Sequence, residues 1–461
     1  MLNFFRVNDP FRLLAVALYI LGLGFLYYFL DPFGLTQTQL TWIVVGERAA
    51  GGFLPFKDII DDTGPLSVGV FSLFEMVFGR NILAYEIAGR ILILWQAIYW
   101  NLILLKYRVL SETSYLPAVL VVCLFHFSFD MLSLSPALLG SCFLLLSIGQ
   151  LFSKTVLQSK QSESTLLIGL HSGLAFGFHP IFLVFLPYMI FAGVAISGFS
   201  FRELILSIIG FLLPALGIAT FYFWNDGLFE LFRVWPMSFF TPRMLYQTLT
   251  SWGLLAIFPL LLAGIGYFLC AVVRGSTINQ QKQRQLLMLW LVVACFELLL
   301  IKDQAGFQLI VLIPTLSYLL TQFFHLTNRT LIANSLFFLL IFGLPIGSIF
   351  YWSSYVNSNP KYLISEKLEA KPREGIMSLQ KDMSPYAQKK LDGPFLNYEM
   401  SKVYSSKTHT LSQKAKLFQL LENQKSEVVL DPNGTFQEIL KSLPALENQY
   451  RQEGKSIFVL K

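Results

Sequence analysis

Apolar runs long enough to cross a lipid bilayer recur along most of this chain, and they limit its possible folds more than any other feature. A membrane-spanning helix needs about 20 mostly apolar residues, and such runs follow one another from residue 13 to residue 352. Only 13% of the residues are charged, whereas about 25% are charged in soluble domains. The sequence therefore predicts a mainly α-helical, polytopic membrane protein.

We expect about eleven membrane-spanning helices in this chain. Their predicted ranges are 13–30, 81–104, 115–131, 132–152, 164–178, 180–198, 203–225, 252–273, 285–302, 305–324 and 330–352. The first run lacks a small-residue cleavage site, so we expect it to span the membrane rather than to be a cleaved signal. With a cytoplasmic N-terminus, almost twice as many loop Lys and Arg residues lie on the inner side as on the outer side. An odd number of spans then places the C-terminal tail outside.

A polar stretch at 35–65 is the long interruption of the apolar pattern near the N-terminus, within a predicted outer loop at 31–80. Charges at a membrane surface often mark function, and this stretch holds Glu47, Arg48, Lys57, Asp58, Asp61 and Asp62. The next apolar run, 66–79, is too short to span a bilayer and contains Glu75. We expect it to form a helix that lies at the membrane interface or re-enters the membrane. The outer loop is therefore the candidate active or binding face.

The composition changes at about residue 355, where long apolar runs end and polar residues dominate. Residues 1–354 are predicted to form the transmembrane domain, and 355–461 a small extracytoplasmic α/β domain. Apolar segments at 375–380, 426–431 and 456–461 alternate with helical patterns, which favours a parallel sheet. No glycine-rich phosphate-binding motif is present, so nucleotide binding is not indicated.

The cysteines and the basic residues exclude two other classes of function. All four cysteines lie inside apolar segments without metal-ligand spacing, so we expect small buried side chains and no metal site. The net charge of +6 comes from scattered residues with no basic-aromatic array, so nucleic-acid binding is not expected.

Two further predicted outer segments carry cations. Arg243 lies in an aromatic-rich loop, 226–251, and Lys302 lies in a turn between two predicted spans. Membrane anchoring and a local ion pair would explain these residues. Contact with a lipid phosphate is the functional alternative.

The order of a span, an outer polar loop, an interfacial helix, many spans and an outer domain resembles the GT-C superfamily of membrane glycosyltransferases. That superfamily includes the protein O-mannosyltransferases and the aminoarabinose transferases of lipid A. The residues that carry the resemblance in the loop are Gly52, Pro55-Phe56, Asp58, Asp61, Asp62, Gly64-Pro65 and Phe78-Gly79-Arg80. The segment 307–319 is similar to a late family span, and the tail is similar to those of a Bacteroidota branch.

The resemblance implies a multi-pass protein of the bacterial inner membrane with its C-terminal domain in the periplasm. It implies transfer of a sugar from a polyprenyl-phosphate donor, with Lys302 as the nearest match to a cation that contacts the carrier phosphate. Where the family has its catalytic acid, however, this chain has Gln37, and the nearby Gln39 is also uncharged. A glutamine cannot accept a proton at neutral pH. Either another carboxylate of the loop replaces that acid, or the protein is not a transferase of the usual kind.

If the protein is an enzyme, a base must activate the acceptor and cations must stabilise the departing phosphate. Asp58, Asp61 and Asp62 are the candidate catalytic residues, and on a helix they would share one face. The coupling of close carboxylates would raise one pKa, and a divalent cation is a possible addition. Gln37, Gln39, Glu47, Arg48, Lys57, Arg243 and Lys302 are the candidate residues for binding the substrate or the lipid phosphate.

Two functions follow as expectations, and a transporter is a third and weaker one because the sequence has no internal repeat. The first is a glycosyltransferase-like membrane protein whose partners are membrane lipid and a lipid-linked sugar. The second is a non-catalytic scaffold of the same fold that binds protein partners in an envelope complex, which the uncharged Gln37 and Gln39 favour.

Overall fold

The computed structural model describes residues 1–461 except for 8, 31–32, 158–161, 273–275, 328 and 407–409. The chain is mainly α-helical and is divided into two compact units. Unit 1 consists of Met1–Phe33, Tyr85–Leu216 and Met244–Ser358. Unit 2 consists of Gly34–Ala84, Gly217–Arg243 and Asn359–Lys461, so the tail shares a unit with the outer loop.

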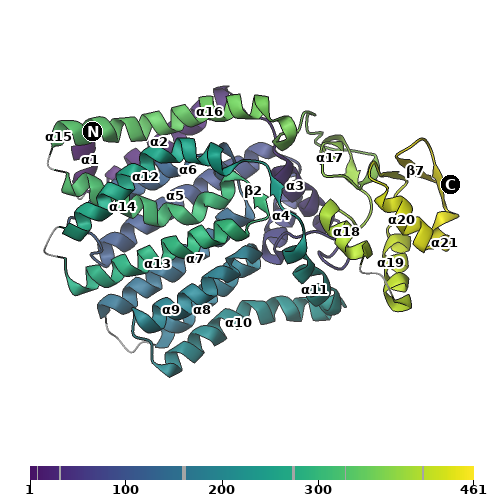
Figure 1. Cartoon of the computed structure of the whole chain (residues 1–461), viewed down its shortest axis with the longest axis horizontal. Coiled ribbons are helices and arrows are strands. Elements are labelled where there is room, and N and C mark those ends of the chain that lie inside the picture. The colour runs from purple at the N-terminus through teal and green to yellow at the C-terminus, as the bar shows by residue number, and fades with distance from the viewer. Residues whose placement is uncertain (8, 31–32, 158–161, 273–275, 328, 407–409) are drawn as a thin grey trace. The chain divides into compact units, whose positions relative to one another are not determined.

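Unit 1 is a set of packed apolar helices, most of them running side by side in Figure 1. Its α-helices are α1 (Leu2–Arg6), α2 (Arg12–Leu30), α5 (Ile82–Lys106), α6 (Leu116–Phe125), α7 (Pro136–Leu157), α8 (Ser162–Phe178), α9 (Phe185–Ala195), α10 (Phe201–Trp224), α12 (Leu249–Val272), α13 (Ile278–Leu300), α14 (Ile313–Leu326), α15 (Thr330–Phe338) and α16 (Leu344–Ser358). Its short helical turns are η1 (Phe129–Leu132), η2 (Pro180–Val184), η4 (Gly306–Leu312) and the π-helical η5 (Leu339–Gly343). Strands β1 (Met244–Leu245) and β2 (Asp303–Gln304) form a parallel pair. The first residues of α5 and the last of α10 belong to unit 2.

Eight helices of the described chain are long and apolar enough to cross a membrane, and they correspond to eight of the predicted spans. The other three predicted spans are shorter helices. Residues 115–131 contain α6 followed by η1, residues 164–178 lie in the 17-residue α8, and residues 180–198 contain η2 and α9. Apolarity alone overestimates the α-helix at 115–131, which ends at Phe125, and at 180–198, where Pro180 begins a 3₁₀ turn before α9.

Glycines allow close helix packing in unit 1, where α8 packs against α10. A Cβ added to Gly169 would lie 1.9 Å from the carbonyl oxygen of Ser207, and one added to Gly173 would lie 2.3 Å from that of Phe211. Two glycines four positions apart on one helix face allow two membrane helices to approach closely. The contact therefore depends on the absence of side chains at these two positions.

Unit 2 is built from three separate stretches of the chain. From the first stretch come α3 (Gln37–Ala50) and α4 (Pro65–Phe78), and from the second come α11 (Leu228–Val234) and η3 (Trp235–Phe240). The tail helices are η6 (Pro360–Tyr362), α17 (Pro385–Gln388), α18 (Tyr398–Ser406), α19 (Leu411–Asn423), α20 (Thr435–Ser442) and α21 (Pro444–Glu447). Helix α4 confirms the helix predicted at 66–79, and its placement at a membrane interface stays a prediction.

The tail contains a five-stranded sheet in the order β4-β3-β5-β7-β6. Strands β3 (Gly375–Ser378), β5 (Val428–Leu430) and β7 (Ile457–Leu460) confirm the three predicted strands, whereas β4 (Lys390–Leu391) and β6 (Tyr450–Gln452) are additional. In register, Met377 pairs with Val429, and Val429 pairs with Phe458. The expectation of a parallel sheet is wrong for β6 and β7, which are antiparallel. The short connection between them forms a hairpin, and a parallel crossover needs a dozen or more residues.

All three stretches of unit 2 contribute to one hydrophobic core. The buried side chains include Phe56 from the outer loop, Tyr222 and Val234 from the middle stretch, and Phe395 and Val429 from the tail. Apolar burial is the main favourable term in folding. The compact unit therefore extends well beyond 355–461, and the independence of the tail as a domain stays a prediction.

The first prediction concerns the α8–α10 contact. We expect Gly169→Ala to lower the free energy of unfolding by about 1–3 kcal/mol, because the new methyl group overlaps the backbone of α10. Gly264→Ala on α12 is the matched control, since nothing lies within 4 Å of a Cβ at that position. The apparent midpoint of thermal unfolding in one detergent measures both variants. Equal midpoints for the two would contradict the predicted contact.

Candidate functional site

The outer loop between α3 and α4 is attached to the tail by backbone hydrogen bonds. The Ile60 N–H donates to the Pro394 carbonyl at 2.7 Å, and the Asn397 N–H donates to the Ile60 carbonyl at 3.1 Å. Phe56 is buried, has a left-handed backbone with a φ of 63°, and stacks on Trp235 at 5.8 Å between ring centroids. The loop is therefore a structured part of unit 2.

Asp58 has a structural role in the loop. Its carboxylate accepts a hydrogen bond from the Leu54 N–H at 2.8 Å, which closes a turn. The chain from 53 to 62 consists of turns and isolated bridges. The condition under which Asp58, Asp61 and Asp62 would share a helix face is therefore not met, because the proline and the turn at 55–58 interrupt helical geometry.

Asp61 is the buried acid of the loop, with only 2% of its surface exposed. Its Oδ2 accepts a hydrogen bond from the Thr63 N–H at 3.0 Å, whereas its Oδ1 has no hydrogen-bond partner among the described residues. Burial, and then the neighbouring charge of Asp62, raise the pKa of Asp61 to about 7. A carboxyl group with such a pKa can gain or lose a proton near neutral pH. The structure thus places Asp61 and Asp62 together and makes their environments different.

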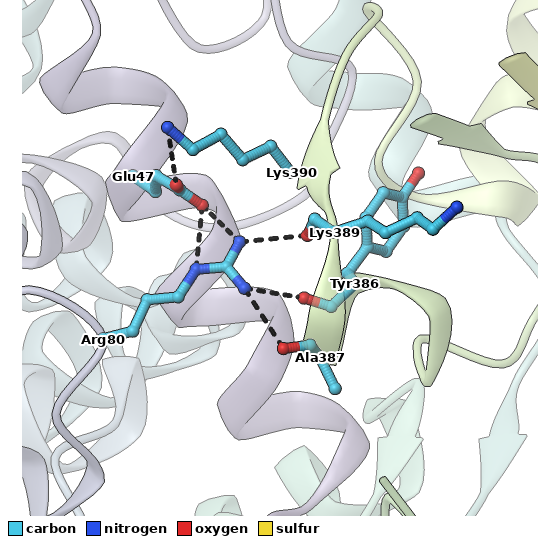
Figure 2. Close-up of polar contacts among 6 residues, drawn as sticks. All are labelled: Glu47, Arg80, Tyr386, Ala387, Lys389 and Lys390. Carbon is cyan, nitrogen blue, oxygen red and sulfur yellow. Dashed lines mark hydrogen bonds and ion pairs between the residues drawn. The ribbon is translucent and has the colours of Figure 1, made fainter. Parts of the chain in front are cut away.

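Glu47 is held by a buried arginine that the sequence did not single out as a site residue. Arg80, whose side chain is 1% exposed, donates from Nε to Glu47 Oε2 at 3.1 Å. Its other nitrogens donate to the carbonyls of Tyr386 at 2.8 Å and of Lys389 at 3.1 Å, as Figure 2 shows. We call this arrangement the Arg80 clamp. It joins α3 to the tail segment before β4.

Gln37 and Gln39 also have defined partners. Gln37 Nε2 donates to Asp382 Oδ1 at 2.9 Å, and its Oε1 accepts from the Met383 N–H at 2.8 Å. Gln39 forms a capping box with Thr36 at the start of α3. At the position of the family's expected acid, this chain therefore has an amide that is bonded to the tail.

The predicted cations of the loop have separate surroundings. The Arg48 guanidinium donates to Gln424 Oε1 at 2.9 Å and stacks over the Phe53 ring at 3.5 Å from its centroid. Lys57 Nζ donates to the Asn225 carbonyl at 2.7 Å. Both contacts join the loop to other stretches of unit 2, so a purely structural role would account for them.

The remaining two predicted cations lie elsewhere in the chain. Arg243 is exposed and is the last residue of the middle stretch of unit 2. Lys302 belongs to unit 1, where its carbonyl accepts from the Met244 N–H at 2.8 Å beside the β1–β2 pair. Their contact with a lipid phosphate stays a prediction.

Three neighbours of the candidate residues were not named as site residues from the sequence, namely Arg80, Glu75 and Lys390. Arg80 was visible only as the residue after the Phe-Gly that ends the apolar run at 66–79. Burial, and then the charge of Glu47, raise the pKa of Glu75. Lys390 Nζ lies 3.9 Å from Glu47 Oε1, and nothing in the local sequence of the tail indicates this contact.

A preformed metal site is not visible in the described part of the chain. No three His, Cys, Asp or Glu side chains lie together there in a way that could hold a metal ion. Asp61 and Asp62 could supply carboxylate oxygens to a hard cation such as Mg²⁺, whose other ligands are often waters and phosphates. A divalent cation therefore stays a prediction.

The second prediction concerns the Arg80 clamp. We expect Arg80→Met to destabilise unit 2 by about 3–5 kcal/mol, because it leaves a partly buried carboxylate without its partner. Limited proteolysis should then cut the tail faster than in the wild type. Arg451→Met, at an exposed arginine of the same unit, is the control. Equal cleavage rates for both variants would show that the clamp does not hold the tail.

Comparisons with known proteins show which solved structures have a similar fold. No protein-family model and no curated protein matches the sequence. The crystal structure of the apo oligosaccharyltransferase of Archaeoglobus fulgidus is similar, with a TM-score of 0.51 and 12% identity over 96% of this chain and 73% of that chain. The structure of the oligosaccharyltransferase AglB of the same organism, in complex with an inhibitory peptide and a dolichol-phosphate, has a TM-score of 0.49 and 11% identity over 93% and 70%. Likeness at such identity concerns the fold and not the activity. This chain is a polytopic membrane protein with a fold similar to that of the archaeal oligosaccharyltransferase.

Proposed function

We propose that this protein transfers a sugar from a polyprenyl-phosphate donor to a hydroxyl-bearing or amide-bearing acceptor at the outer face of a bacterial inner membrane. The proposal rests on one observation above all. Asp61 is a buried carboxyl group with one oxygen atom unpartnered among the described residues, in the loop where the fold would need a base. The pKa of about 7 suits proton transfer at neutral pH.

In the proposed reaction, the ionised Asp61 accepts a proton from the acceptor. The acceptor atom forms a bond to the anomeric carbon of the sugar, and the bond from that carbon to the phosphate oxygen breaks. The electron pair of the broken bond leaves with the phosphate. Cations at the departing oxygen would stabilise its charge, and Lys57 and Arg243 of the same unit are the proposed source. Asp62 has a positioning role, because its charge raises the pKa of Asp61.

The orientation in the membrane is part of the proposal. The distribution of loop cations supports a cytoplasmic N-terminus, which would place the loop and the tail in the periplasm. Lipid-linked donors would then reach the loop from the outer leaflet.

The third prediction is a pH profile of the transfer activity. We expect the rate to rise with pH and to be half-maximal near pH 7, because only the ionised Asp61 accepts a proton. Asp62→Asn should move the midpoint to lower pH, because it removes the charge that raises the pKa of Asp61. Asp61→Asn should lower the rate by about 10²–10⁴-fold. The assay measures transfer of radiolabel from a panel of polyprenyl-phosphate hexoses in membrane vesicles. Full activity of Asp61→Asn would contradict the assignment.

The fourth prediction tests whether the carboxyl group of Asp61 has a raised pKa in the folded protein or the ordinary pKa of a structural aspartate. The ordinary pKa of an aspartate side chain is 3.8, and burial raises the pKa of Asp61 in the folded protein to about 7. Between these values the folded state holds a proton that the unfolded state has released, so stability falls as pH rises from about 4 to about 7. Relative to the wild type, Asp61→Asn should therefore gain stability over this range, on the order of a few kcal/mol.

Chemical denaturation at a series of pH values measures this gain. Asp226→Asn is the control, because Asp226 is exposed and asparagine tolerates its φ of 52°. A constant difference in stability between Asp61→Asn and the wild type at every pH would contradict the raised pKa.

A second candidate function is that of a non-catalytic scaffold in an envelope complex. It is favoured by Gln37, whose amide is bonded on both sides to the tail where an acid would be expected. Copurification with a stable complex, together with a normal glycan profile in cells that carry both Asp61→Asn and Asp62→Asn, would favour this function over the first.

A further inference from the structure

A small cavity in unit 2 lies between the C-terminal half of α3 and strand β4. Its volume is about 140 Å³, and its polar and aromatic walls come from Glu47, Arg48, Phe53 and Lys390. Pockets for drug-sized ligands have volumes of about 300–1,000 Å³. This cavity therefore suits a group no larger than a single ring.

The cavity presents both an acceptor and donors for hydrogen bonds. The Arg80 clamp occupies Oε2 of Glu47, whereas Oε1 lies 3.9 Å from Lys390 Nζ, beyond hydrogen-bond distance. The Lys390 side chain is 51% exposed and carries three donors. A ligand with several hydroxyl groups could bond to both kinds of atom, since a hydroxyl both donates and accepts.

The charges of the wall compensate one another. Glu47 has Arg80 and Lys390 as its cationic neighbours. Three carboxylates act on the Arg48 guanidinium, and they belong to Asp392, Asp58 and Glu47. A phosphate or carboxylate would need uncompensated cations. The wall therefore favours a neutral ligand, and the stacked Phe53 and Arg48 supply a flat surface for it.

We propose that this cavity binds one neutral sugar ring, separately from the reacting group at Asp61. This inference rests on the proposed function, in which either the donor or the acceptor carries such a ring. Gln424 joins the cavity to the reactive loop, because it accepts from Arg48 and donates to the Asp58 carbonyl at 3.0 Å. A sugar bound there would contact the same loop that carries Asp61.

The fifth prediction uses the full-length protein in detergent. Saturation-transfer NMR is recorded with the methyl glycosides of glucose, mannose, galactose and N-acetylglucosamine, and with methyl glucuronide as the charged probe. At least one neutral glycoside should bind more tightly than methyl glucuronide. Excess inorganic phosphate should not displace this glycoside. Lys390→Met and Phe53→Leu should each weaken that binding about tenfold. Lys389→Met is the control, because its side chain pairs with Glu374.

The binding measurements test the sugar site independently of the proposed transfer activity. Asp61→Asn should bind the glycoside as tightly as the wild type does, even if transfer is lost. Absence of neutral glycoside binding, tighter binding of methyl glucuronide, displacement by phosphate, or unchanged binding in Lys390→Met would each overturn the inference while leaving the role of Asp61 intact. Lys390 is half-exposed, so Lys390→Met should keep the thermal midpoint of the wild type, which serves as the check of folding.

In the transfer assay, the same variants identify which sugar the cavity holds. If Lys390→Met raises the KM for the lipid-linked donor alone, the ring belongs to the donor, and if it raises the KM for the acceptor alone, the ring belongs to the acceptor. An unchanged KM for both substrates would overturn the inference.

Discussion

The hydrogen bonds and the ion pair of the buried Arg80 guanidinium are the interactions on which the attachment of the tail within unit 2 depends. The guanidinium bonds Glu47 of α3 on one side and backbone carbonyls of the tail on the other (Figure 2). An arginine suits this task because its planar fork of five N–H groups can bond several acceptors at once, which a lysine cannot do. Gln37 adds a second attachment to the same part of the tail, at Asp382 and Met383. The tail is thereby held against the outer loop.

The environment of Asp61 follows from this attachment. Ile60, the residue before it, exchanges backbone hydrogen bonds with the tail at 394–397, and Phe56 is buried in the core that the loop and tail share. Packing of this kind removes Asp61 from water, and burial is the first cause of its raised pKa. A loosened clamp should therefore also lower that pKa. Stability in the tail and chemistry in the loop are coupled in this account.

The elements that have a strong local sequence pattern were predicted correctly from the sequence. The long apolar runs, the helix at 66–79 and the three apolar strands of the tail were all predictable, because hydrophobic periodicity is a local signal. The length of α6 was not, because a short helix and its following turns are as apolar as a full span. Strands β4 and β6 are too short to show a pattern.

Within the site, the sequence identified the loop and its carboxylates but could not rank them. Asp58 and Asp61 look alike in the sequence, yet one closes a turn and the other has a raised pKa. Asp58 bonds the nearby Leu54, whereas Asp61 follows Ile60, whose backbone bonds the tail more than three hundred residues away along the chain. The same holds for Arg80 and Lys390, whose partners are equally distant in sequence. Such contacts carry no local signature.

The proposed role of Asp61 as a base depends on its protonation in the folded protein, which can be measured directly. Difference infrared spectroscopy of the wild type against Asp61→Asn, titrated from about pH 4 to about pH 9, isolates the carboxyl band of this residue. We expect a protonated carboxyl band that disappears with a midpoint near pH 7. A midpoint near the ordinary value of 3.8 would contradict this expectation.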